Sequence, residues 1–302
     1  MQIVFSGLAT GAIYGLVAMG FAVAFYVTRV INFALGQLLM TAVMVTAALA
    51  RSGWPTAVSA LAGLLCAAVF GGLIYLLAVQ PVLSFSRFSF AWLVSTLGVA
   101  TILEAGAAII WGPTSRAFPT MLNSQPVHLL GATVSWQELL AVIVSLAVAG
   151  AFTVFRRRTL FGKVGMAIAV DPEMASAVGV NTTAVAVGAF AIAGLLAGLA
   201  GILVGPITFA NPYLGETYGI NGFVALMIGG IERPVGALFG GLLLGVLSQL
   251  ANTEINSQAA DWFPFLIVVA VLLLTPSGLF AHSWAPLRRL APRRRLGAEG
   301  TS

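Results

Sequence analysis

Long apolar stretches separated by short polar breaks run through this chain. A helix needs about 20 mainly apolar residues to cross the hydrocarbon core of a membrane. Stretches of that kind lie at 3–27, 31–50, 57–79, 91–112, 137–155, 184–205 and 262–281. The pattern predicts an all-α fold, a polytopic membrane helical bundle of about 8–9 transmembrane segments.

One further stretch, 219–251, is interrupted. Gly229, Gly230, Glu232, Arg233 and Pro234 divide it into pieces of 13 and 17 residues. A 13-residue helix is about 20 Å long, which is shorter than the roughly 30 Å core. The pieces form either two tight spans or a re-entrant pair, and both arrangements leave the termini on the same sides.

Glycines recur at helical spacing in two of these stretches. The first span carries such a face, and so does the span at 184–205: Gly7, Gly11, Gly15; Gly188, Gly194, Gly198, Gly201, Gly205. Small residues let membrane helices approach closely. We expect packing faces here, either within the chain or against a second membrane subunit.

The composition agrees with a membrane protein. Of 302 residues only 23 are charged, 14 basic and 9 acidic, whereas an average soluble chain of this length carries roughly 75. Apolar residues make up 60% of the chain, more than a single soluble core would bury. This excludes a soluble enzyme, a disordered chain and a nucleic-acid binder. Cys66 is the single cysteine, so we expect no disulfide.

The basic residues indicate the orientation, because Lys and Arg are retained on the cytoplasmic side. With the N-terminus outside and the C-terminus cytoplasmic, two basic residues, Arg51 and Arg116, are external. The other twelve are internal: Arg29, Arg87, Arg156, Arg157, Arg158, Lys163, Arg233, Arg288, Arg289, Arg293, Arg294 and Arg295. We therefore divide the chain into a transmembrane domain, 1–287, and a basic cytoplasmic tail, 288–302.

The longest internal connection, 156–183, concentrates the cytoplasmic surface. Asp171, Pro172 and Glu173 are typical of a helix start, because they supply a cap, a preorganised first residue and a favourable charge. Gly179 is a natural stop. We predict a helix of about 10 Å over 172–178. It is either a connector along the membrane surface or, given its small apolar residues, a helix that fits a protein cleft.

Three segments resemble one family. They are Phe161-Gly162-Lys163 followed by Asp171 to Gly179, then Ile31-Asn32-Phe33-Ala34 with Gly36, and Gly229-Gly230 with Gly236-Ala237 and Gly240-Gly241. They resemble the coupling loop, an early signature and a late glycine-rich signature of ABC importer permeases of the branched-chain amino-acid group. Leu35 and the Glu232–Arg233 pair depart from the pattern, and they leave the solute open.

The resemblance implies a docking surface for an ATP-binding subunit. By position, the implied coupling residues are Phe161, Gly162, Lys163, Asp171, Pro172, Glu173, Ala175 and Gly179. The implied partners are a second permease chain, forming a homo- or heterodimer, two cytoplasmic ATP-binding subunits and an external solute-binding protein. The implied location is the bacterial inner membrane, in contact with lipid.

The chain itself lacks the motif for nucleotide chemistry. A phosphate-binding loop has the form Gly-x-x-x-x-Gly-Lys-Ser/Thr, whereas the one lysine, Lys163, is followed by Val164. We also see no nucleophile with its base, and no histidine or carboxylate set for a metal. We expect no catalytic residues, no metal and no cofactor, so ATP hydrolysis is left to partners.

Four residues are candidates for the translocation pathway: Asn32, Glu104, Gly229 and Gly230. Glu104 falls near the middle of a predicted span, where an ionised carboxylate costs about 3 kcal/mol. It is either a polar contact on the route or a hydrogen-bonded structural residue. Asn32 is either a pathway residue or a helix cap.

These observations favour a permease subunit of an ABC importer for branched-chain amino acids or related small solutes. Such a subunit alternates between outward-open and inward-open states, driven by ATP hydrolysis on its partners. An ion- or proton-coupled secondary transporter is the alternative, with the interrupted 219–251 stretch as its broken helix and Glu104 as proton carrier.

Overall fold

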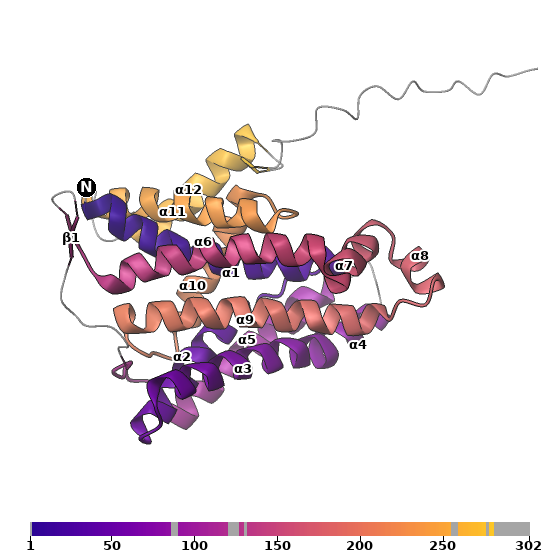
Figure 1. Cartoon of the computed structure of the whole chain (residues 1–302), viewed down its shortest axis with the longest axis horizontal. Helices are drawn as coiled ribbons and strands as arrows, with labels where there is room; N and C mark the ends of the chain where they lie inside the picture. Colours follow the sequence, from indigo (N-terminus) through magenta and orange to yellow (C-terminus); the bar gives the residue numbers. More distant parts are fainter. Residues whose placement is uncertain are drawn as a thin grey trace, which may run out of the picture.

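The structure is a computed structural model of the full chain, and it describes residues 2–85, 90–119, 127–129, 132–254, 259–275 and 278–280. Arg87 and the basic tail 288–302 lie outside the described residues. Within them the fold is a bundle of mostly long helices with a small antiparallel hairpin at one end (Figure 1).

The helices cover most of the described chain. In order they are α1 (Gln2–Thr28), α2 (Leu35–Arg51), α3 (Thr56–Ile74), the π-helical η1 (Tyr75–Val79), α4 (Gln80–Phe85), α5 (Ala91–Trp111), α6 (Trp136–Arg158), α7 (Leu160–Val170), α8 (Pro172–Ala177), α9 (Thr182–Thr208), α10 (Leu214–Gly229), α11 (Pro234–Glu254) and α12 (Ala259–Leu274). Strands β1 (Val127–Leu129) and β2 (Ala132–Val134) pair antiparallel, with Val127 opposite Val134. The hairpin is a small addition to the predicted all-α fold.

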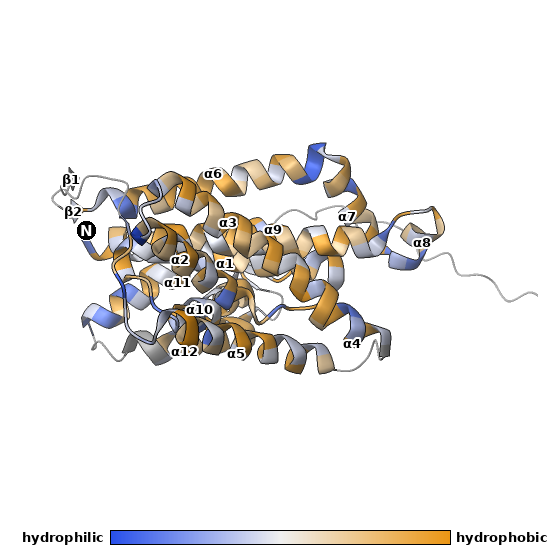
Figure 2. Ribbon diagram, turned by 90° about the horizontal axis from the view of Figure 1, so that it is seen from below, coloured by the Kyte–Doolittle hydropathy of each residue, from blue (hydrophilic) through white to orange (hydrophobic). Residues whose placement is uncertain are grey.

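Six helices are long and apolar enough to cross a membrane: α1, α3 with its extension to Ser84, α5, α6, α9 and α11. Shorter helices accompany them, among them α2 with 17 residues and α10 and α12 with 16 residues each. Figure 2 shows hydrophobic residues along the body of the bundle. The chain is therefore a multi-pass membrane protein, while the count of 8–9 spans and the orientation stay predictions.

The third span continues beyond its predicted end at residue 79. A π-helical turn, η1, joins α3 to α4, and Pro81 lies in the first turn of α4. Proline has no N–H to donate, and its ring clashes with the carbonyl four residues earlier in a regular helix. A π-turn at that place accommodates the ring while the helix goes on.

The two glycine faces pack inside the chain. A Cβ atom on Gly11 would lie 2.7 Å from the Gly241 carbonyl oxygen, and one on Gly7 would lie 2.8 Å from Val246 Cα. Helices α1 and α11 therefore run antiparallel with their backbones in contact. On α9, Gly194 and Gly201 approach the backbones of α3 and α2 in the same way. The alternative of a glycine face for a second subunit is thus not what the structure shows.

Helix α2 begins deep inside the bundle, four residues later than the pattern predicts. The backbone of Arg29 is left-handed, with φ of 57°, and the chain then turns back so that Leu35 contacts Gly20 of α1. Gly20 lies eight residues before the end of α1, roughly 12 Å along the helix. The segment that returns the chain from α1 to the start of α2 is buried at Val30 and Asn32.

The interrupted stretch forms two antiparallel helices, α10 and α11. Gly229 contacts Gly236, and Gly240 approaches Ala225. The predicted lengths of 13 and 17 residues were wrong, because α10 begins at Leu214 and α11 continues to Glu254. With 21 residues, α11 is long enough to span. Hydropathy excludes the polar residues at 214–218 and 252–254. They nevertheless form the first turn of α10 and the last turn of α11.

Candidate coupling surface and translocation pathway

Helix α8 projects beyond the body of the bundle, at the end opposite the N-terminus (Figures 1 and 2). The Asp171 carboxylate accepts hydrogen bonds from the backbone N–H groups of Glu173, at 3.0 Å, and Met174, at 2.9 Å. Pro172 occupies the first helical position, and Gly179 has a φ of 89°. The predicted helix, its cap and its glycine stop are confirmed, with the last helical residue at 177 instead of 178.

Sequence reasoning missed helix α7, which joins α6 to α8. Thr159 caps it by accepting a hydrogen bond from the Gly162 N–H at 3.1 Å. A threonine followed by an apolar run is a helix-start signal, but the three arginines directly before it are typical of a polar loop. Helix α7 contacts α1, α6, α8 and α9, so it connects α8 firmly to the bundle.

The predicted coupling residues divide into exposed and packed groups. Lys163, Asp171, Pro172, Glu173 and Gly179 are exposed. Ala175 is only 5% exposed and faces the chain's own body. Two exposed apolar side chains form the outer surface instead: Met174 of α8, at 68%, and Val178, directly after the last residue of α8, at 78%.

Phe161 and Gly162 belong to the packed group. The Phe161 ring lies against Gly188 of α9, and its centroid is 6.1 Å from that of Phe155. A Cβ atom on Gly162 would overlap the Arg156 backbone. These two residues therefore fix the angle between α6 and α7 and leave the outer surface to α8.

An ion pair connects three segments at this end of the bundle. Arg29 follows α1, and its Nη1 lies 2.6 Å from Oε1 of Glu232 in the turn between α10 and α11. Its Nη2 donates to the Ala169 carbonyl of α7 at 3.2 Å. One side chain therefore joins α7 to the α10–α11 turn.

A groove of about 580 Å³ lies between α8 and the body of the chain. Its walls come from α8, from the end of α1, from η1 and α4, and from α7 and α9, and they include Glu173, Ser176, Tyr75 and Ala186. The groove therefore separates the inner side of α8 from η1 and from the start of α9.

Glu104 is half-buried and paired. Its Oε2 accepts a hydrogen bond from Nε2 of Gln37 in α2 at 2.8 Å. Gln37 is 5% exposed, and within the described part of the chain its Oε1 has no hydrogen-bond partner. Sequence reasoning did not single out Gln37, although it is the amide in the otherwise apolar or hydroxylated start of α2.

Helix α10 begins beside the Gln37–Glu104 pair. Gly215, in its first turn, lies directly against the Gln37 side chain, and a Cβ atom there would overlap Oε1. The next two residues, Glu216 and Thr217, are exposed. Tyr218 of α10 packs on Tyr14 of α1 with ring centroids 5.6 Å apart. The first turns of α10 therefore lie alongside the middle of α1.

Asn32 is fully buried in the return before α2. Its Oδ1 accepts a hydrogen bond from the Ala34 N–H at 3.1 Å, and its carbonyl accepts one from Leu35. Ala34, not Asn32, is the cap residue of α2. Asn32 thus shapes the turn that starts α2 inside the bundle.

Gly229 and Gly230 serve the α10–α11 turn. A Cβ atom on Gly229 would overlap the Gly236 carbonyl, and Gly230 has a φ of 100° and contacts Gly278. Gly229 is fourteen residues, roughly 21 Å along the helix, from Gly215. The structure therefore separates these glycines from the Gln37–Glu104 pair.

Known sequences decide the family. The family model described as "Branched-chain amino acid transport system / permease component" matches residues 3–275. The chain belongs to this family. As a permease component it is not the catalytic part of such a transporter.

Individual relatives agree with the family model. The permease is 30% identical to "High-affinity branched-chain amino acid transport system permease protein LivH" of Escherichia coli, covering 93% of this chain and 96% of the relative. It is 28% identical to BraD of Pseudomonas aeruginosa over the same shares. It is also 27% identical to the fructose import permease FrcC of Rhizobium meliloti, over 74% and 62%. No solved structure matches the permease.

Proposed function

We propose that this permease is the membrane subunit of an ABC importer that translocates branched-chain amino acids or related small solutes by alternating access. ATP hydrolysis on two cytoplasmic partner subunits supplies the free-energy difference between the states. A second permease chain and an external solute-binding protein complete the assembly. The observation that carries this proposal is α8, a capped, exposed helix whose outer surface is formed by Met174 and by Val178 directly after its end.

In this proposal α8 is the lever. An ATP-binding subunit holds its outer surface, and α7 carries the movement to α1 and α9. The Arg29–Glu232 pair passes it on to the α10–α11 turn. The orientation follows from the same surface, because α8 and the ends of α1 and α6 then lie in the cytoplasm.

The pathway runs, in this proposal, past the Gln37–Glu104 pair. A carboxylate and a buried amide oxygen that has no partner within the described part of the chain suit the ammonium group of an amino acid. The exposed Glu216 follows Gly215, the residue of α10 that lies against Gln37. We place Asn32 behind this site, where it holds the start of α2 in position.

The first experiment tests the lever. The complete transporter is reconstituted in vesicles with ATP inside, and uptake of radiolabelled leucine is measured for Met174→Glu and Val178→Asp against Met174→Leu and Val178→Ile. We expect the charged variants to lose ATP-driven uptake and the conservative variants to keep it. Full uptake by the charged variants would overturn the role of α8.

The same vesicles separate the importer from a secondary transporter. We expect no uptake without the ATP-binding subunits, and no loss of uptake when a protonophore dissipates the proton gradient. Uptake by the permease alone, driven by a proton gradient, would overturn the importer proposal and favour Glu104 as a proton carrier.

A third set of variants tests the pathway. Glu104→Gln keeps an acceptor for Gln37 but removes the charge, and Thr101→Val, one turn away on the exposed side of α5, is the control. We expect Glu104→Gln to raise the KM for leucine at least tenfold while ATP hydrolysis without solute is unchanged. A KM equal to that of the control would remove Glu104 from the pathway.

A further inference from the structure

A second groove, of about 760 Å³, lies at the same end of the bundle on another side. It is lined by the end of α6, the α10–α11 turn, the start of α11 and Tyr26 of α1. We call it the arginine groove, because Arg156, Arg157 and Arg233 all line it. None of these residues belongs to the coupling surface or to the Gln37–Glu104 pair.

The charge in the arginine groove is strongly positive. Glu232 is the acid among its lining residues, and its carboxylate is paired with Arg29 at 2.6 Å. The lining therefore carries three arginines against one glutamate, and Nη1 of Arg233 also donates to the Phe280 carbonyl at 3.3 Å. Arg156 is further held in place, because its guanidinium lies 5.8 Å from the centre of the Tyr26 ring, within the range of a cation–π contact.

The groove changes from charged to aromatic along its length. Phe152 lies one turn before Arg156 on α6, about 6 Å deeper, and Phe239 lies five residues after Pro234 on α11. Phe239 is 44% exposed. Both aromatic residues lie on the apolar part of helices long enough to span the membrane, whereas the arginines lie at the helix ends.

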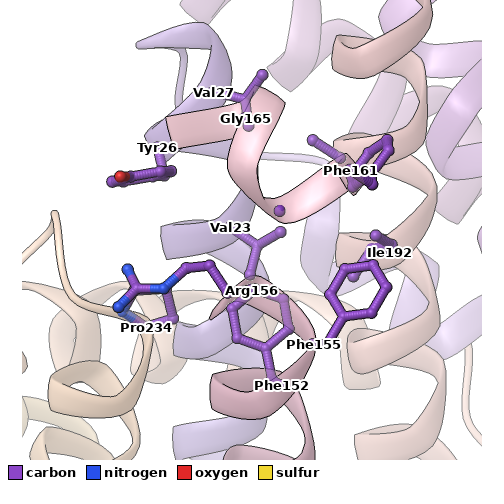
Figure 3. A pocket seen from close by; sticks show the side chains of 12 residues that line it. Val23, Tyr26, Val27, Phe152, Phe155, Arg156, Phe161, Gly165, Ile192 and Pro234 are labelled. Carbon is purple, nitrogen blue, oxygen red and sulfur yellow. The ribbon is translucent and has the colours of Figure 1, made fainter. Parts of the chain in front are cut away.

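A narrow apolar crevice continues the groove between α1, α6, α7 and α9. The two share Tyr26, Phe152, Arg156 and Pro234. Figure 3 shows Arg156 and Tyr26 on one side of this crevice, with Phe155 and Phe161 on the other. An acyl chain beside Phe152 would meet a continuous apolar wall.

We propose that the arginine groove binds one anionic phospholipid, with its phosphate among Arg156, Arg157 and Arg233 and an acyl chain along Phe152 and Phe239. Basic pockets between spanning helices on the cytoplasmic side are suited to anionic headgroups. The gradient from arginine to phenylalanine matches the molecule from headgroup to tail. A bound lipid would hold α6 against α11, next to the Arg29–Glu232 pair.

The test uses the purified full-length permease in nanodiscs, made of phosphatidylethanolamine with a rising fraction of phosphatidylglycerol. Bound lipid is counted by native mass spectrometry. We expect one retained phosphatidylglycerol, and roughly fivefold weaker retention in each of Arg156→Gln, Arg157→Gln and Arg233→Gln, from the usual contribution of one basic residue near an anionic surface. Equal retention of the two lipids would overturn the proposal.

Arg158→Gln is the matched control, since Arg158 is exposed in the same helix turn and lies outside the groove lining. We expect it to retain the lipid like the parent, and an equal loss would show general surface attraction in place of a site. Glycerophosphoglycerol, the headgroup without acyl chains, should not displace the lipid at equal concentration. Displacement by it, or by inorganic phosphate, would show a phosphate site and overturn the lipid assignment. Melting temperatures in pure phosphatidylethanolamine check that each variant is folded.

Discussion

The contact between α1 and α11 yields a quantitative prediction. A Cβ atom on Gly11 would lie 2.7 Å from the Gly241 carbonyl oxygen and 2.9 Å from Leu242 Cα. Both neighbours are backbone atoms, so no side chain can turn away. To reach even a tight contact of 3.4 Å the helices must separate by about 0.7 Å, the difference between 3.4 and 2.7.

We expect Gly11→Ala to be destabilised relative to a matched variant, Gly106→Ala. Gly106 lies in α5, and among the described residues no atom lies within 4 Å of the place that its Cβ atom would take. Both variants gain the same helix propensity, about 1 kcal/mol, so their difference isolates the steric term. Overpacking costs about 1–3 kcal/mol, and we expect that difference.

The assay is thermal unfolding of the detergent-purified protein, followed by tryptophan fluorescence. One kcal/mol corresponds to roughly 2–4 °C in a domain of 150–250 residues, so a difference of about 1–3 kcal/mol should make Gly11→Ala melt roughly 2–12 °C below Gly106→Ala. The double variant with Gly241→Ala should lose less than the sum, because one separation of the helices relieves both overlaps. Equal melting temperatures for the two single variants would refute the close contact.

Three further predictions concern the coupling end. Asp171→Ala removes the cap of α8 and should cost about 0.5–2 kcal/mol of local helix stability, seen as faster hydrogen exchange of the α8 amides, whereas Asp171→Asn should exchange like the parent. Gly179→Val should lower the rate of solute-stimulated ATP hydrolysis, because the left-handed backbone at this position costs a residue with a side chain about 1–2 kcal/mol. Gly179→Asn should not lower it, because asparagine tolerates this conformation. Arg29→Gln and Glu232→Gln should show a coupling energy of under about 1 kcal/mol in a double-mutant cycle of unfolding, since the pair is exposed, while either change alone should reduce solute-stimulated ATP hydrolysis. A large stability loss would make this pair a structural contact and not a transmitting one.

Local sequence predicted the coupling end well where the determinants are local. Asp171, Pro172 and Gly179 act through their own backbone neighbours, so their order predicts a capped helix and its end. Helix α7 was missed, although Thr159 is its cap. The three arginines directly before Thr159 are typical of a polar loop, so the pattern did not predict a helix there. The face of α8 was also not predictable in full, since Ala175 is buried by the body of the chain.

The Gln37–Glu104 pair, the proposed pathway site, was only half predictable. Glu104 stands out in a sequence because a carboxylate in an apolar span is costly. Its partner Gln37 is an unremarkable amide, and the two are 67 positions apart. Asn32 was placed at a helix start, but its burial follows from the return of the chain into the bundle, which a left-handed Arg29 permits.

The sequence by itself determined that this is a membrane protein, where most of its long apolar helices lie and where the short helix α8 begins. Hydropathy and capping are properties of neighbours along the chain, so they can be read without a structure. The tertiary structure decided which glycine faces meet, that α2 and α10 begin inside the bundle, and that Gln37 meets Glu104. Those contacts join segments far apart in sequence, and they arise from the packing of whole helices against each other.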